Sequence, residues 1–202
     1  MLPTDNAYGP WPASGEIDIV ESRGNMNCEA GGVDSFGSTL HWGPGWPMDP
    51  YEKAHADYKH PTGTLNDEFH TYELEWTKEH IITRIDNNEV LNFPFDEDMF
   101  TKGGFDPSVN NPWRGETDLN APFNREFYLI FNVAVGGTND YFPDGKCGKF
   151  WTNDDPKAVN TFYNQKDTWY KTWNYPETHD SAMQIDFVKV WAYDDEGNEI
   201  LQ

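Results

Sequence analysis

Glycine and proline interrupt this chain at short intervals along its whole length, and this spacing limits the elements that it can form. The 202 residues include 17 Gly and 14 Pro, and no stretch between them keeps a helical apolar repeat. A chain divided in this way favours short strands over long helices. Short strands separated by turn signals are typical of an antiparallel sandwich or jelly roll. About 200 residues suffice for one such all-β domain, so we expect a single domain over 1–202.

Segments of alternating or continuous apolar character mark the expected strands. The segment 127–135 is one apolar run, as expected of a strand buried on both faces. Asp86, Asn87 and Asn88 predict a hairpin turn, because Asn tolerates a positive φ. The stretch 138–176 predicts an aromatic-rich loop region with one short helical turn. The predicted strands are 16–20, 38–42, 69–76, 81–85, 89–91, 127–135 and 184–193.

The excess of acidic residues excludes two classes of partner. Asp and Glu number 35 against 14 Lys and Arg, which gives a formal net charge of −21. Such a field repels phosphate backbones and anionic lipids, so we expect no nucleic acid and no membrane partner. Apolar runs are too short to span a bilayer, and no signal peptide follows Met1 in this chain. A neutral polymer is compatible with the charge, and the aromatic content of 16% permits stacking on sugars.

The two cysteines leave two interpretations open. Cys28 and Cys147 are an even pair far apart in the sequence. In an oxidising compartment they form one disulfide, and otherwise they stay as free buried thiols.

Three carboxylates lie close together in the segment 15–21. Glu16 and Asp18 share one face of the predicted strand, and the isoleucines between and after them face the apolar layer. Strict alternation puts Glu21 on the wrong face. One β-bulge at Ile19 and Val20 inserts the extra residue and returns Glu21 to the acidic face.

This cluster is suited to the cleavage of glycosidic bonds. Like charges on one face raise at least one pKa, so one carboxyl stays protonated while another is ionised. Glycoside hydrolysis uses such a pair, and a spacing of about 5–5.5 Å leads to retention of configuration. The residues alone leave two alternatives open, a solvated acidic face and a calcium-binding acidic strand.

At this point the sequence resembles a known family. The segment 11–21, WPASGEIDIVE, resembles the active-site signature of family 16 glycoside hydrolases in its bulged E-x-D-x-x-E form, which is found in the laminarinase branch. The similarity is greatest to invertebrate β-1,3-glucanases and their β-1,3-glucan-binding relatives. Further segments match in the same order, namely 38–43, 69–72, 75–77, 127–137 and 183–191.

The resemblance implies a jelly-roll sandwich of two antiparallel sheets with a concave cleft that binds β-1,3-glucan. It implies that Glu16 is the nucleophile, Asp18 its assistant and Glu21 the general acid and base. Trp11 is implied as a sugar-stacking platform and His41 as a neighbour of the acid and base. The implied reaction is retaining hydrolysis of internal β-1,3-glucosidic bonds, with no cofactor required.

Several other residues have a structural and a functional interpretation. Asn132 is the polar residue within an apolar strand, so it is either a core amide or a hydrogen-bonding group of the cleft, and we favour the cleft. Trp42 either lines the cleft or packs in the core, and we include it among the substrate-binding residues. Asp186 interrupts the last strand, and the resemblance implies that it contributes to a structural calcium site.

Three functions compete at this stage. The first is an extracellular, monomeric endo-β-1,3-glucanase, and the second is a non-catalytic β-1,3-glucan-binding protein. The presence of Glu16, Asp18 and Glu21 favours the enzyme, since binding relatives commonly lose a catalytic glutamate. The third is an inactive fragment, because the family domain normally begins several strands before the Trp11 segment and its N-terminal part is absent from this chain.

Overall fold

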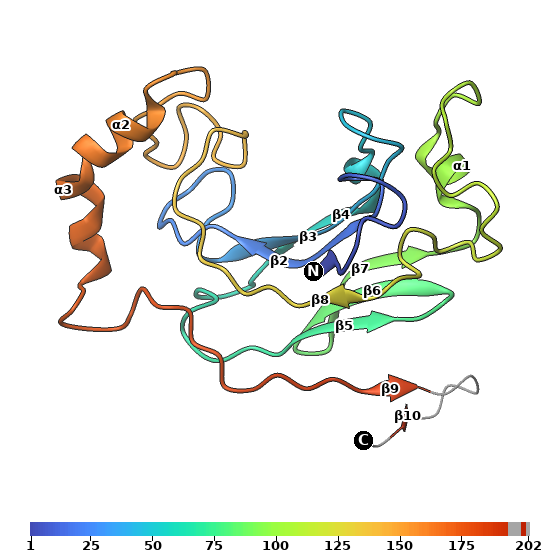
Figure 1. Cartoon of the computed structure of the whole chain (residues 1–202). Coiled ribbons are helices and arrows are strands. Elements are labelled where there is room, and N and C mark those ends of the chain that lie inside the picture. Colours follow the sequence, from blue (N-terminus) through green and yellow to red (C-terminus); the bar gives the residue numbers. More distant parts are fainter. Residues whose placement is uncertain (194–198, 201–202) are drawn as a thin grey trace. The chain divides into compact units, whose positions relative to one another are not determined.

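A computed structural model describes residues 1–193 and 199–200 of the chain (Figure 1). Two compact units are present, Met1–Asp154 and Asp155–Gln202, and each is described by itself. The single domain expected over 1–202 stays a prediction, because the presence of two compact units does not test it. Within the described residues, no helix has the length and apolar character needed to cross a bilayer.

The first sheet of the larger unit carries the acidic segment. It has the antiparallel strand order β2-β3-β4. Its strands are β2 (Glu16–Ser22), β3 (Ser35–His41) and β4 (His55–Lys59). The short strand β1 (Leu2–Pro3) pairs separately with β8 (Phe127–Tyr128). The predicted strands 16–20 and 38–42 are therefore confirmed, with boundaries that differ by up to three residues.

The second sheet is an antiparallel meander with the order β5-β6-β7. Its strands are β5 (Tyr72–Trp76), β6 (His80–Ile85) and β7 (Asn88–Pro94). The predicted hairpin turn is confirmed, because Asp86 and Asn87 have φ values of 48° and 68° between β6 and β7. Such positive values suit Asp and Asn, whose short polar side chains tolerate the left-handed region.

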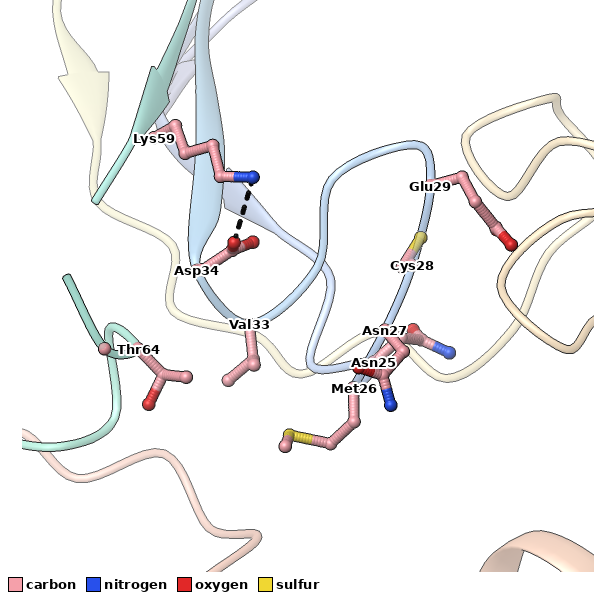
Figure 2. A pocket seen from close by; sticks show the side chains of 10 residues that line it. Asn25, Met26, Asn27, Cys28, Glu29, Val33, Asp34, Lys59 and Thr64 are labelled. Atoms are coloured by element: carbon pink, nitrogen blue, oxygen red, sulfur yellow. Dashed lines mark ion pairs between the residues drawn. The ribbon is translucent and has the colours of Figure 1, made fainter. Parts of the chain in front are cut away.

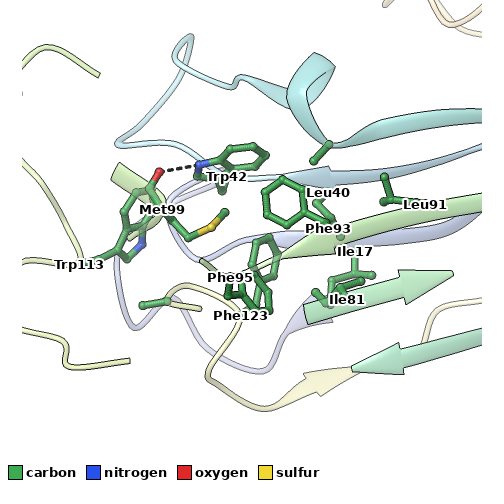
Figure 3. Close-up of a cluster of buried hydrophobic side chains, with 12 residues drawn as sticks. Ile17, Leu40, Trp42, Ile81, Leu91, Phe93, Phe95, Met99, Trp113 and Phe123 are labelled. Atoms are coloured by element: carbon green, nitrogen blue, oxygen red, sulfur yellow. Dashed lines mark hydrogen bonds between the residues drawn. The ribbon is translucent and has the colours of Figure 1, made fainter. Parts of the chain in front are cut away.

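The apolar faces of the two sheets pack against each other and form the core (Figure 3). Ile17 and Leu40 from the first sheet meet Ile81, Leu91 and Phe93 from the second. A buried hydrogen bond of 2.9 Å from Thr83 Oγ1 to Ser38 Oγ also joins the two sheets. The predicted class, a mostly-β protein with two antiparallel sheets packed as a sandwich, is confirmed.

Trp42 belongs to this core. Its side chain is 0% exposed, and Nε1 donates a hydrogen bond of 3.0 Å to the carbonyl of Met99. No surface remains for contact with a ligand, so the prediction of Trp42 as a substrate-binding residue is wrong. The sequence did not decide this because Trp42 directly follows the last residue of β3, where either face was open to it.

Short helices complete the described elements. In the larger unit these are η1 (Tyr51–Ala54) and α1 (Met99–Gly103), and Asp98 caps α1 by accepting a hydrogen bond from the Thr101 amide. The smaller unit contains α2 (Ala158–Asn164), α3 (Lys166–Trp169), η2 (Tyr170–Trp173) and the strand pair β9 (Ala192–Tyr193) and β10 (Glu199–Ile200). The segment 138–176 is thus more helical than the one turn predicted, and stacking of Phe162 on Trp169 at 4.6 Å supports these helices.

Two predicted strands are largely wrong. Of 127–135 only Phe127 and Tyr128 pair, and of 184–193 only Ala192 and Tyr193 pair. Most apolar side chains of both segments are exposed, as Phe131 and Val133 of the first and Phe187 of the second illustrate. High β propensity requires a neighbouring strand to be realised, and the described residues supply none to these segments.

A substitution at Trp42 tests the importance of the core contact. Trp42→Ala removes a buried indole and should lower the free energy of unfolding by about 3–5 kcal/mol. Trp46→Ala is the matched control, because Trp46 is 73% exposed, and it should change the same quantity by only about 0.5 kcal/mol. Equilibrium unfolding in urea measures both, and equal losses would contradict the assignment of Trp42 to the core.

Candidate active site

A β-bulge in β2 brings three carboxylates to one face of the first sheet. Asp18 pairs with Thr39 and Glu21 with Gly37, so three steps along β2 match two steps along β3. The bulge predicted from the sequence is confirmed at this place. On the opposite face Ile17 is completely buried in the core, which fixes Glu16 and Asp18 on the outer face.

The turn before β2 is held tightly in place. Gly15 has a φ of +83°, and a Cβ there would lie 3.1 Å from Pro122 and Phe123 atoms, so only glycine fits without strain. Trp113 Nε1 donates a buried hydrogen bond of 2.9 Å to the Ala13 carbonyl. These contacts fix the direction in which the chain enters β2.

Trp11 contacts the first carboxylate directly. Its Nε1 donates a hydrogen bond of 2.7 Å to Glu16 Oε2. The indole lies 5.7 Å from the rings of both Trp46 and His41, and it is partly exposed. Trp11 and the exposed Trp46 thus form an aromatic surface next to the acidic residues. Sequence reasoning did not single out Trp46, since no pattern separated it from the other loop tryptophans.

His41 lies between two aspartates. It is opposite Glu16 in the register of β2 and β3, and its Nε2 lies 3.3 Å from Asp18 Oδ2. Its Nδ1 donates a hydrogen bond of 2.7 Å to Asp49 Oδ2. Burial of the ring opposes its charge, but the hydrogen bonds and charges of Asp18 and Asp49 outweigh burial and raise the pKa of His41 to about 10. The sequence carried no signal for Asp49, which lies in a loop without a recognisable motif.

The two glutamates have perturbed and unequal environments. Burial raises the pKa of Glu16 and of Glu21, and the negative charge of Asp18 adds to this rise in each. The Trp11 hydrogen bond stabilises the ionised form of Glu16 and lowers its pKa in part. In the part of the chain that the structure describes, the Glu21 carboxyl accepts no such hydrogen bond. The Trp11 hydrogen bond therefore favours a charge on Glu16, whereas the positive charges of His41 and Arg23 offset the raised pKa of Glu21 only in part.

The loop after β2 is tied to a distant part of the larger unit. Arg23 Nε donates a hydrogen bond of 2.7 Å to the Tyr141 carbonyl, and its guanidinium lies 4.1 Å from the centre of the Tyr141 ring. Cys28 and Cys147 form a disulfide, which decides between the two interpretations that the sequence left open. These contacts anchor the segment that directly follows Glu21.

A shallow hollow of about 420 Å³ lies along this loop (Figure 2). Polar and apolar groups line it in equal measure, and an ion pair of 3.3 Å between Lys59 and Asp34 borders it. None of the three carboxylates lines it. Its lining residues are Asn25, Met26, Asn27, Cys28, Glu29, Val33, Asp34, Lys59, Gly63 and Thr64.

Asn132 and Asp186 are the two remaining predicted site residues. Asn132 is exposed in an unpaired segment, and its role in a cleft stays a prediction. Asp186 is exposed, and among the described residues no group of three His, Cys, Asp or Glu ligands includes it. The calcium site that the resemblance implies at Asp186 stays a prediction.

One group of donor atoms in the described residues is compact enough to meet at a single point. It consists of one atom each from Glu16, Asp18 and His41, all within 4.8 Å of one another. Glu16 already accepts the Trp11 hydrogen bond, and the His41 ring lies against Asp18. The contacts within the group therefore account for its compactness, and we assign no metal to it.

Comparison with known proteins identifies the family. Residues 4–116, more than half of the chain, match the family described as "Glycosyl hydrolases family 16". The chain belongs to glycosyl hydrolase family 16. The family resemblance seen in the sequence is thereby confirmed, and the matched range includes all three carboxylates, Trp11, His41 and Asp49.

Individual relatives of this family 16 chain have different names. A "Beta-1,3-glucan-binding protein" from Penaeus monodon is 45% identical over 194 residues, which cover 95% of this chain and 53% of that protein. A "Glucan endo-1,3-beta-glucosidase A1" from Niallia circulans is 36% identical over 141 residues, or 69% of this chain and 18% of that protein. The chain thus spans about half the length of the first relative and less of the second.

Among solved structures, the laminarinase from Rhodothermus marinus is similar to this chain. The two are 25% identical, and the match covers 61% of this chain and 41% of that one with a TM-score of 0.40.

The charge on His41 leads to a testable dependence of stability on pH. The folded-state pKa of about 10 lies above the unfolded value of about 6.5, so the charge stabilises the fold fully below about pH 6.5. This contribution is lost as the pH rises through about 10. His41→Gln should therefore lower the melting temperature most at about pH 6, and the deficit should shrink toward about pH 10.

Thermal melting at several pH values measures this difference. The control is His179→Gln, because His179 is exposed in the smaller unit. This variant should change the melting temperature by little, because it alters an exposed side chain. A deficit of His41→Gln that stays constant from about pH 6 to about pH 10 would contradict the raised pKa.

Proposed function

We propose that this family 16 chain hydrolyses internal β-1,3-glucosidic bonds of glucans such as laminarin with retention of configuration. The observation that carries the proposal is the bulged strand β2, which presents Glu16, Asp18 and Glu21 together on one face. The unequal environments of the two glutamates support it, because a retaining enzyme needs one ionised and one protonated carboxyl. The name of the Niallia circulans relative also supports it.

Each carboxylate has a role in the proposed double displacement. Glu16, held by Trp11, attacks the anomeric carbon, and Glu21 donates its proton to the glycosidic oxygen as the bond breaks. Glu21 then takes a proton from water, which attacks the anomeric carbon and releases Glu16. Asp18 lies between them in the strand, and its negative charge favours the protonated form of Glu21.

The aromatic surface of Trp11 and Trp46 is the proposed platform for the sugar. Indole faces contact the apolar C–H faces of sugar rings, and both residues have exposed surface. A neutral glucan suits a chain with a net charge of −21, which disfavours anionic polymers. The disulfide supports action outside the cell, since disulfides persist in oxidising compartments.

A second function, binding of β-1,3-glucan without cleavage, is favoured by one observation. The relative at 45% identity is named a β-1,3-glucan-binding protein. The same strand and the same aromatic surface serve both functions. Measured hydrolysis of laminarin distinguishes the enzyme from the binding protein.

Replacement of the catalytic glutamates tests the proposed reaction. Glu16→Gln and Glu21→Gln should each lower the release of reducing sugar from laminarin by a factor of at least about 100, because each removes a group that acts in the transition state. Binding of laminarin should remain. The control is Glu89→Gln, which changes an exposed glutamate at the β6–β7 hairpin and should keep normal rates. Near-normal rates for Glu16→Gln would overturn the nucleophile assignment.

The stereochemistry of the first product tests the mechanism independently. Proton NMR of a fresh laminarin digest should show the β-anomer first, because two displacements at one carbon restore the configuration. An initial α-anomer indicates a single displacement and contradicts the role of Glu16. No release of sugar, together with laminarin binding and a cooperative melt, favours the binding function.

A further inference from the structure

Asp49 is a buried carboxylate that the proposed reaction does not use. It lies in the loop between β3 and η1, and its side chain is only 6% exposed. Oδ2 accepts the hydrogen bond of 2.7 Å from His41 Nδ1. Oδ1 is buried and has no hydrogen-bond partner among the described residues. A buried carboxylate is costly unless a cation or several donors balance it, and His41 is the group that Asp49 contacts.

The contacts of the imidazole favour its protonated form. Nδ1 faces Asp49 and Nε2 faces Asp18, so each ring nitrogen has a carboxylate oxygen next to it. A neutral imidazole has one N–H and can donate to only one of these carboxylates. The imidazolium has two N–H groups and can donate to both.

The titratable groups on every neighbouring element are compatible with a positive charge on the His41 ring. The titratable groups that act on or lie against the ring are Glu16, Asp18 and Glu21 of β2, Asp49 of the loop and Tyr51 of η1. All the carboxylates favour a cation, and no Lys or Arg among the described residues contacts the ring. The remaining neighbour is Trp11, which is uncharged.

We infer that Asp49 is a positioning residue that keeps His41 doubly protonated and fixed against Asp18, and thereby maintains the charge pattern of the two catalytic glutamates. The cation on His41 lowers the pKa of Glu16 and of Glu21, while Asp18 raises both. Loss of the cation removes one side of this balance and also removes the donor from Asp18. The effect on catalysis rests on the proposed function, whereas the contact between Asp49 and His41 does not.

The test replaces the charge of Asp49 and keeps its shape. In Asp49→Asn the amide oxygen can still accept the Nδ1–H bond, but it no longer stabilises the cation. Nitrogen-15 NMR of the ring nitrogens follows the state of His41, and its signals are assigned by their loss in His41→Gln. Wild-type His41 should keep both ring protons through about pH 8 and titrate near pH 10. In Asp49→Asn the midpoint should fall by roughly one to three pH units.

Asp57→Asn is the matched control, because Asp57 also pairs with a histidine on the same sheet. Its Oδ1 lies 3.3 Å from His55 Nε2, and its side chain is exposed. This variant should leave the His41 midpoint unchanged. A neutral His41 at about pH 8 in the wild type would overturn the inference without any variant, so a failure of Asp49→Asn to fold does not prevent the test. An unchanged midpoint in folded Asp49→Asn would overturn it as well.

Kinetics on laminarin give a second readout that a purely structural role does not predict. At about pH 5 both proteins hold a protonated His41, so their kcat values should agree within about threefold. As the pH passes the lowered midpoint of Asp49→Asn, loss of the cation raises the pKa of Glu16 and of Glu21, so the ratio of its kcat to the wild-type kcat should change by up to about tenfold. A ratio that is the same at all pH values would contradict the coupling. If no laminarin is cleaved at all, the proposed function fails while the NMR titration still decides the inference.

Discussion

Strand β2 has to bury one side chain while its neighbours carry charge, and the rest of the site follows from that arrangement. Ile17 is completely buried between the two sheets, whereas Glu16 and Asp18 face the other way. Because alternate residues of a strand point to opposite faces, a slip of one position would drive both carboxylates into the core. The apolar contacts of Ile17 therefore fix the register that places Glu16 opposite His41.

The bulge after Asp18 adds a third carboxylate to this face and concentrates negative charge there. Such a cluster is unfavourable on its own, since like charges raise the pKa values of their neighbours. The structure offsets the repulsion with the Trp11 hydrogen bond to Glu16 and with His41, which Asp49 in turn supports. The same contacts make the two glutamates unequal. Structural stabilisation of the cluster and its chemical use thus depend on one set of interactions.

Long-range contacts hold the loops that surround this strand. The disulfide and the stacking of Arg23 on Tyr141 connect the segment after Glu21 to residues more than one hundred positions later in the chain. By contrast, the apolar segments 129–135 and 183–191 have no strand partners among the described residues and are exposed. The core between the two sheets forms without them, because its buried residues come from positions 17–123.

The local sequence pattern was sufficient to predict part of this structure. Alternation placed β2, the turn residues Asp86 and Asn87 placed the second hairpin, and the odd spacing of Glu21 required the bulge that the structure contains. These features depend on residues within a few positions of one another, so the sequence reports them directly. The family resemblance likewise rested on the segment that carries the three carboxylates, and the match over residues 4–116 agrees with it.

Other features depend on which segments meet in space, and no local pattern encodes that. Trp42 and Trp46 are four residues apart in similar surroundings, yet one fills the core and the other is exposed. The apolar run 129–135 had every propensity of a strand, but a strand also needs a neighbour to pair with. Asp49 could be identified only from the structure, because the loop after β3 places its Oδ2 2.7 Å from Nδ1 of His41. The sequence by itself determined the acidic face and its bulge, and the tertiary structure decided which groups balance its charge, because that balance depends on distances between segments that are separate in the chain.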